Sequence, residues 1–148
     1  MKKIILVGTD EGSFDYNRNL EFGKIKDEEI GIELHSEMVF KPGLDKILIR
    51  IGVRYMLKKE QILIYSVALW FKVENWDAYT NGMSDEAILA TDESMRMLAV
   101  TVGFLRGSLS LQERTTPFKG AFLPLINIKD LAKEVVINRL KDEKSVNK

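Results

Sequence analysis

The side chains best suited to chemistry in this sequence are two glutamates and a histidine that alternate along one short stretch. Glu33, His35 and Glu37 would share one face of a strand, because successive strand residues point to opposite faces. Neighbouring members would start about 7 Å apart. His35 is the only histidine, and the chain has no cysteine, so no further nitrogen or sulfur ligand completes a metal shell. We expect a solvated strand face, without metal or cofactor.

The sequence supports nucleophilic catalysis and phosphate binding no better than it supports a metal site. Any Ser–His pair would have to be built on His35. The opening residues KIILVGTDEGS resemble a strand that enters a phosphate loop, but no lysine follows the second glycine, and Asp10 and Glu11 stand where phosphates would bind. Paired-carboxylate hydrolysis would need a carboxyl in apolar surroundings, and none of the 22 acidic residues is marked in that way. We therefore predict that the protein is not an enzyme.

Two arginines on one strand face raise the question of an anionic partner. Arg50 and Arg54 alternate with apolar residues, and either ion pairs or the rim of an interface is the simpler interpretation. The chain carries 22 basic and 22 acidic residues, so its bulk charge predicts no polyanionic partner. No window approaches the roughly 18 apolar residues of a membrane span. We expect neither nucleic-acid binding nor membrane insertion.

The length of 148 residues fits one domain, 1–148, with a single core. Within it, we expect residues 1–27 to form a weakly structured lead-in, in which Lys3 to Gly8 is either a short strand or an apolar stretch. Residues 141–148 should form a frayed tail. The absence of cysteine suits a reducing compartment, and the apolar run near Met1 is shorter than the roughly 7–15 residues of a signal peptide. We expect a cytoplasmic location, with which both features are compatible.

Three stretches in the first half of the chain have the period-two pattern of strands. Residues 30–40 and 47–55 each place apolar side chains on one face. The third stretch, QILIYSVALWFKV at 61–73, is apolar on both faces, and Trp70 lies on the second of them. A strand covered on one side only does not need that second face. Short polar reversals join these stretches, so we predict an antiparallel meander of about four strands.

A long helix should follow the strands, capped by Ser84 or Thr91. Gly103 and Gly107 lie four residues apart on it, and each costs about 1 kcal/mol of helix propensity against alanine. Such a cost suggests close contact with another backbone, and we expect an oligomer interface at these two glycines.

The stretch TTPFKGAFLPLINIKDL, residues 115–131, separates this helix from a short last one. Pro117 and Pro124 prevent it from continuing the helix before it, and Asn127 is suited to cap the helix after it. We call residues 123–127 the Pro-broken segment. The predicted class is α+β, with an antiparallel sheet, a long helix and a short C-terminal helix.

This order of elements, together with one motif, resembles the SecB export-chaperone family. FLRGSLSLQERTTPFKGAFLPLINIKDL looks like that family's glycine-containing turn and Leu-Pro-x-Ile-Asn-Phe type segment before a last helix, and KILIRIGVRYMLKKEQILIYSVALWFKVE is similar to its central hairpin. The resemblance covers residues 30–133. It implies a dimer of dimers whose apolar grooves hold unfolded, extended polypeptide.

From this resemblance we predict a chaperone that works without ATP, as a homodimer or homotetramer, on an export precursor or an antitoxin-like protein. The expected groove residues come from the doubly apolar strand and the stretch that holds the second proline: Ile62, Ile64, Trp70, Phe122, Leu123 and Leu125. One alternative is a small α+β enzyme or ligand-binding domain, with a pocket near Tyr65, Arg50 or His35. Another is a structural protein whose apolar face only mates subunits.

Overall fold

The computed structural model describes residues 2–21, 24–40, 43–118 and 123–140. The predicted α+β class is confirmed, with strands first and then a long and a short helix. In chain order the elements are β1 (Ile4–Glu11), β2 (Asp15–Tyr16), η2 (Asp27–Glu29), β3 (Ile30–Phe40), β4 (Lys46–Leu57), β5 (Glu60–Val73), α1 (Trp76–Thr80), α2 (Asp85–Leu89), α3 (Asp92–Glu113), α4 (Ile128–Ala132) and β6 (Val136–Arg139).

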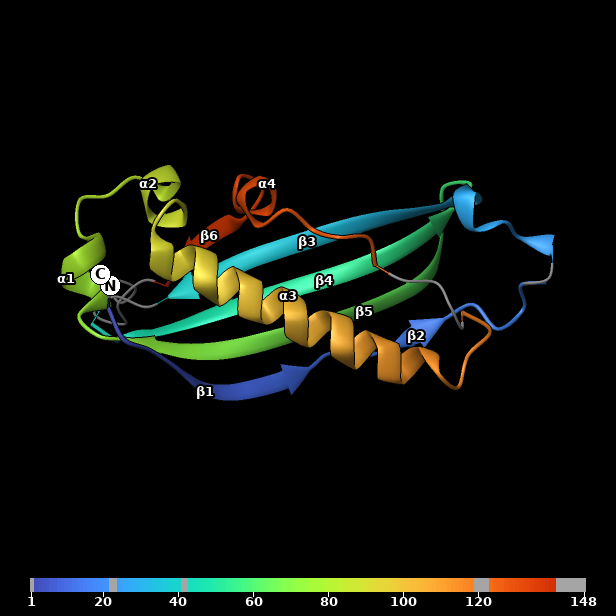
Figure 1. Cartoon of the computed structure of the whole chain (residues 1–148), viewed down its shortest axis with the longest axis horizontal. Helices are drawn as coiled ribbons and strands as arrows, with labels where there is room; N and C mark the ends of the chain where they lie inside the picture. The colour runs from blue at the N-terminus through green and yellow to red at the C-terminus, as the bar shows by residue number, and fades with distance from the viewer. Residues whose placement is uncertain (1, 22–23, 41–42, 119–122, 141–148) are drawn as a thin grey trace, which may run out of the picture.

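One sheet of six strands contains all the described β-structure, in the order β1-β5-β4-β3-β6, with β2 also paired to β5. The antiparallel neighbours β3, β4 and β5 are the three predicted strands (Figure 1). The sheet differs from a four-strand meander at both edges. β1 pairs antiparallel with β5, and β6 pairs in parallel with the end of β3. β6 has only four residues and no period-two pattern, so no local signal marks it as a strand.

The described part of the lead-in, residues 2–21 and 24–27, contains more regular structure than expected, because β1 and β2 lie in it. Of the two interpretations of Lys3 to Gly8, the structure has the strand, and it extends through the polar residues Thr9, Asp10 and Glu11. These residues carry no apolar pattern, and their place in the sheet comes from backbone pairing with β5. The predicted frayed tail at 141–148 lies outside the described residues.

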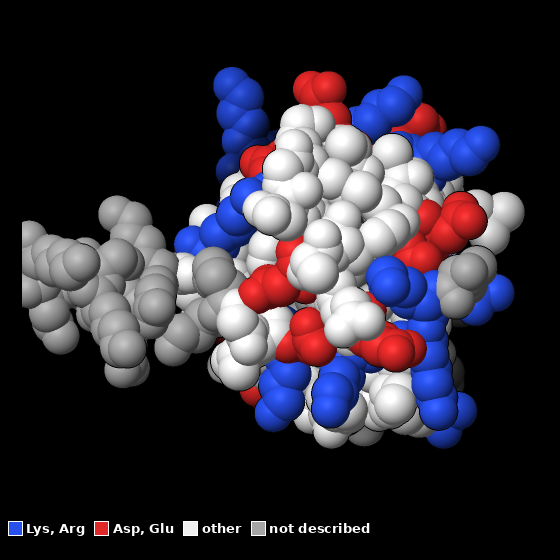
Figure 2. Space-filling model, turned by 90° about the vertical axis from the view of Figure 1, so that its left-hand side faces the viewer, with Lys and Arg blue, Asp and Glu red and all other residues white. Residues whose placement is uncertain are grey.

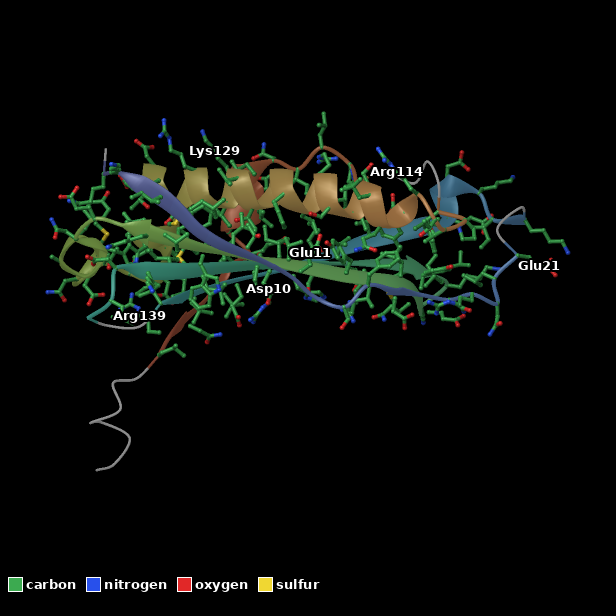
Figure 3. The ribbon with its side chains drawn as sticks, turned by 90° about the horizontal axis from the view of Figure 1, so that it is seen from below. Asp10, Glu11, Glu21, Arg114, Lys129 and Arg139 are labelled. Atoms are coloured by element: carbon green, nitrogen blue, oxygen red, sulfur yellow. The ribbon has the colours of Figure 1, made fainter. Side chains whose placement is uncertain are left out.

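The core lies between the sheet and α3, which crosses one face of it (Figure 1). Figure 3 shows the two layers, the sheet and α3, edge-on. Lys129 lies on the helix side of the sheet, and Asp10 lies on the opposite side. We call that other, uncovered side the back face. The core residues of β4 and β5 alternate with back-face residues, and they are Ile47, Ile49, Ile51, Val53, Tyr55, Leu63, Tyr65, Val67, Leu69, Phe71 and Val73.

Side-chain caps begin the helices where the sequence predicted them. The Ser84 and Thr91 hydroxyls accept hydrogen bonds at the starts of α2 and α3, so both candidate caps are used, each on its own helix. Asn127 accepts from the backbone N–H of Asp130 at 3.2 Å and begins α4. α4 ends at Ala132, and the chain turns from there into β6. Among the described residues, no helix is long and apolar enough to cross a membrane.

Candidate functional site

The back face carries two of the predicted groove residues. Trp70 and Ile64 point away from α3, because they alternate on β5 with the buried Leu69 and Tyr65. They are 42% and 37% exposed. Trp70 lies opposite Leu48 of β4 in the strand register. The second apolar face of β5 is therefore open in the protomer.

Ile62 does not join this surface. The register between β4 and β5 shifts between Tyr55 and Met56, and Ile62 is the residue left without a partner opposite. An irregularity of this kind re-aims the extra side chain. Ile62 is 1% exposed and belongs to the core.

The Pro-broken segment lies against α3, on the helix side of the sheet. The guanidinium of Arg106 donates hydrogen bonds of 2.7 and 2.9 Å to the carbonyl oxygens of Leu123 and Pro124. Leu123 is buried in the core, whereas Leu125 is 96% exposed. Phe122 lies outside the described residues. The predicted groove is thus divided: Trp70 and Ile64 lie on the back face, and the leucines lie in a segment held to α3.

The outward side of α3 is uncharged over most of its length. Between Arg96 and Arg114, its exposed residues form what we call the α3 stripe: Ala99, Val100, Gly103, Gly107, Ser110 and Leu111. A Cβ atom added at Gly103 or Gly107 would meet no atom within 4 Å outside the local helix backbone. The close backbone contact expected at these glycines is therefore not made within the described protomer, and an interface there stays a prediction about a second subunit.

A cavity of about 650 Å³ opens between α2, α4 and the first turn of α3. We call it the α2–α4 pocket. Leu89, Met95 and Ala132 give it apolar walls, and Lys129 and Lys133 stand on its α4 side. α4 comes from a part of the sequence far from α2 and the start of α3, so no local motif could reveal this pocket. The sequence signal for this pocket was limited to single apolar residues: Leu89 in α2, Met95 in α3 and Ala132 in α4.

Charged side chains on the back face are paired across β3 and β4. Arg50 lies 2.9 Å from Glu37, and Arg54 lies 2.9 Å from Glu33, as predicted for these arginines. His35 sits between the two pairs. The part of the chain that the structure describes holds no group of three His, Cys, Asp or Glu residues that could bind a metal ion.

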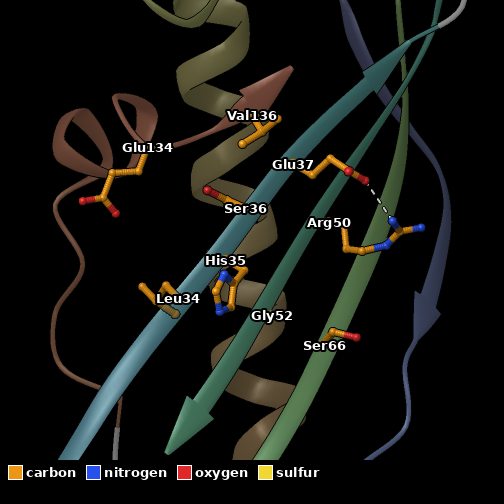
Figure 4. A pocket seen from close by; sticks show the side chains of 9 residues that line it. All are labelled: Leu34, His35, Ser36, Glu37, Arg50, Gly52, Ser66, Glu134 and Val136. Carbon is orange, nitrogen blue, oxygen red and sulfur yellow. Dashed lines mark hydrogen bonds and ion pairs between the residues drawn. The ribbon is translucent and has the colours of Figure 1, made fainter. Parts of the chain in front are cut away.

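Two depressions adjoin on the back face and share His35, Gly52 and Ser66. The first, about 370 Å³, reaches the ion pair of Glu37 with Arg50 and the start of β6 (Figure 4). The alternative prediction placed a pocket near Tyr65, Arg50 or His35, between sheet and helix. The two depressions lie near these residues, with Tyr65 in the lining of the second. The first reaches round β3, because its lining includes Leu34, Ser36 and Glu134 as well as His35 and Glu37.

A buried carboxyl ends α3. The phenol of Tyr55 donates a 2.8 Å hydrogen bond to Glu113, which is 5% exposed. Burial raises the pKa of Glu113 to about 7, against the lowering effect of that hydrogen bond. Burial, followed by the nearby carboxylate, raises the pKa of Tyr55 as well. The pair joins the end of α3 to β4, which is a structural role.

Acidic and basic side chains are interspersed on the end of the molecule formed by α1 and α2. They surround an uncharged area in the centre of that view (Figure 2). This mixture gives no field of a single sign at this end.

No protein-family model matches the chain, and no curated protein matches its sequence. Among solved structures, the chain is similar to a SecB-like chaperone of Mycobacterium tuberculosis in complex with a ChAD peptide from the HigA1 antitoxin. That match has a TM-score of 0.42 and 15% identity, and it covers 86% of this chain and 89% of the other. A Streptococcus agalactiae protein of unknown function is similar with a TM-score of 0.44 and 13% identity, over 84% of this chain and 99% of the other.

Both TM-scores lie below 0.5. The function of this chain is therefore inferred from its own residues.

Proposed function

We propose that the protein is a cytoplasmic chaperone that binds apolar side chains of unfolded polypeptide in the α2–α4 pocket, without ATP and without catalysis. The observation that carries this proposal is an open apolar pocket on a protomer whose core is already complete. Its clients are extended segments, as an export precursor or an antitoxin-like protein would offer.

The completeness of the core decides how exposed apolar residues are interpreted. Trp76, Phe71 and Met38 are 2% exposed or less, so the core contains large side chains that are fully buried. In contrast, Val100, Leu111 and Trp70 are exposed, and the α2–α4 pocket opens where the core residues Leu89 and Ala132 meet the partly buried Met95. Apolar surface that remains exposed on a folded protein marks a site where it binds another molecule. Binding of other polypeptide is a function that uses such surface directly.

The pocket suits side chains of varied shape. A volume of about 650 Å³ falls in the usual range of binding cavities. Met95 in its wall is flexible and polarizable, so it can adapt to different apolar guests. A wall of this kind gives affinity by apolar burial with low specificity. The Pro-broken segment leads into α4, and its exposed Leu125 adds an apolar contact for a client just before that helix.

We propose that the α3 stripe meets the same stripe of a second copy, which gives a homodimer or, with a further interface, a homotetramer. Small residues at Ala99, Gly103 and Gly107 would let two helices approach closely. The absence of charge along the stripe means that no ion would be left unpaired at such a contact.

The test is suppression of aggregation of a reduced, unfolded client by the wild-type protein and two variants. Met95→Glu places a charge in the pocket, and Leu44→Glu places the same charge at a 48% exposed leucine outside it. We expect protection by the wild type and Leu44→Glu, and loss of protection in Met95→Glu with its circular dichroism unchanged. Equal protection by both variants, or none by the wild type, contradicts the proposal.

A further inference from the structure

The charges that line the α2–α4 pocket are divided between its helices. Lys129 and Lys133 stand on the α4 side, and Glu86 belongs to α2; all three side chains are exposed. Figure 3 shows Lys129 on the helix side of the sheet. The other described residues that line the pocket carry no charge. A client side chain in the pocket therefore has two cations on one side of it.

The two lysines are not neutralised by the described part of the chain. Each ion pair formed within it involves other side chains. Lys133 caps the C-terminus of α4 with helical backbone angles, so Lys129 and Lys133 have the four-residue spacing at which side chains of one helix are neighbours. Like charges at this spacing repel each other. A carboxylate between the two ammonium groups would relieve that repulsion.

The acidic residues next to these lysines in the sequence lie outside the pocket lining. Glu134 lines the depression that reaches round β3 (Figure 4). Asp130 is absent from the described lining of the α2–α4 pocket, where Glu86 on α2 is the only carboxylate. The α4 side of the pocket is therefore positive, and an acidic group of a client is favoured on that side and disfavoured near α2.

Apolar walls and a positive side together narrow the class of client. An inorganic anion would bring nothing to the walls formed by Leu89, Met95 and Ala132. A purely apolar segment would leave both lysines without a partner. A segment in which an acidic residue flanks an apolar one uses both features. Because an exposed ion pair contributes only about twofold to fivefold in affinity, the charge sets a preference and apolar burial supplies most of the binding.

We propose that the α2–α4 pocket selects, among unfolded segments, those in which an acidic side chain flanks the apolar anchor. The apolar side chain fills the pocket, and the carboxylate lies between the ammonium groups of Lys129 and Lys133. Glu86 orients the segment, because it keeps the acidic residue on the α4 side. This inference rests on the proposed function, since it names the sequences that the client site takes.

Three end-blocked peptides test this preference by isothermal titration calorimetry at low salt. They share a Leu-Phe-Leu centre and differ in one flanking residue, which is Asp, Asn or Lys. We expect the Asp peptide to bind about fivefold more tightly than the Asn peptide, and the Lys peptide to bind most weakly. High salt should remove most of this difference, because it screens exposed charges. Hexanoate, added as a competitor at the concentration of the peptide, should not displace the Asp peptide.

Charge variants assign the preference to the pocket. The double variant Lys129→Gln, Lys133→Gln should bind the Asp and Asn peptides equally, with unchanged affinity for the Asn peptide. Glu86→Gln removes a repulsive carboxylate and should tighten binding of the Asp peptide. The matched control is Lys46→Gln with Lys72→Gln, which removes the same net charge from two exposed lysines on the back face and should keep the preference.

The outcomes separate this inference from the function on which it rests. If none of the three peptides binds, the client site itself is wrong, and the inference is overturned with it. If the peptides bind with equal affinity, the client site stands and the acidic preference is overturned. Loss of the preference in the back-face control would trace it to net charge, and displacement by hexanoate would assign the pocket to small acids. Either result also overturns the proposal.

Discussion

Arg106 and Leu123 are joined by a hydrogen bond of 2.7 Å from the guanidinium of α3 to a main-chain carbonyl 17 residues further along the chain. The same side chain holds the carbonyl of Pro124 at 2.9 Å. A proline has no N–H, so this part of the Pro-broken segment cannot be held by donating to a neighbouring strand. The arginine takes the place of such backbone pairing. It keeps Leu123 in the core while Leu125 remains exposed.

We expect Arg106→Ala to lower the free energy of unfolding by about 1–3 kcal/mol, because two charge-assisted hydrogen bonds are lost at a partly buried site. Chemical denaturation measures this change. Arg106→Lys should recover only part of this stability, because an ammonium group lacks the planar fork of donors with which a guanidinium bonds two carbonyl oxygens at once. Arg114→Ala, an exposed change on the same helix, is the control and should stay within about 0.5 kcal/mol of wild type. Equal effects at positions 106 and 114 would show that the two hydrogen bonds do not hold the segment.

Gly103→Ala and Gly107→Ala should have opposite effects on the protomer and on its assembly. Each added methyl finds free space on the described protomer and gains about 1 kcal/mol of helix propensity. The same methyl would hold a second α3 stripe away. We expect native mass spectrometry to show weaker association for both variants, with Ser110→Ala as a matched change that adds no bulk. Wild-type protein that is a monomer at every concentration contradicts an interface at the stripe.

Glu113 predicts how stability depends on pH. Burial raises its pKa from the ordinary value of 4.5 to about 7, so between these pH values the folded state binds more protons than the unfolded state. The contribution of this group to stability is therefore present at low pH and is lost as pH rises from about 4.5 through about 7. Melting temperatures measured from pH 5 to pH 8 should fall less steeply in Glu113→Gln than in wild type. Parallel curves for the two proteins would remove Glu113 as the cause.

Trp70→Ala distinguishes a client contact on the back face from a structural interface. Trp70 is 42% exposed, so the protomer should keep its fold. If clients use the back face, loss of a large aromatic contact lowers their affinity about tenfold or more while the assembly stays intact. Fluorescence polarization with a labelled unfolded polypeptide measures the affinity, and Lys72→Ala on the same face of β5 is the control. If the Trp70→Ala variant dissociates into protomers, the back face is an interface between subunits.

The central strands and the helix caps could be predicted because their signals are local. Period-two alternation indicated β3, β4 and β5, and the capping residues Ser84, Thr91 and Asn127 each satisfy a backbone N–H within three residues. β1 and β6 depend on pairing with strands far away in the sequence. Their own residues carry little pattern, so tertiary pairing rather than propensity places them.

The candidate site was harder to predict than the fold. Of the predicted groove residues on β5, Trp70 and Ile64 are exposed on its second face, and their role in binding stays a prediction. Ile62 lies in the core, because the β4–β5 register is irregular at Tyr55 and Met56. A sequence pattern with strict alternation cannot anticipate such a shift. The α2–α4 pocket depends on where α4 docks, and no short motif contains that information.

Site-specific photo-crosslinking is the most direct test of the proposed client site. A crosslinking amino acid at Ala90, an exposed residue that lines the α2–α4 pocket, is compared with one at Leu44. The client is a permanently unfolded, reduced and carboxymethylated protein, and its folded form is the competitor that should have no effect. A client adduct at Ala90 that is absent at Leu44 and lost in Met95→Glu is the predicted result. Adducts of equal yield at both positions, or none at Ala90, would contradict binding of unfolded polypeptide in the pocket.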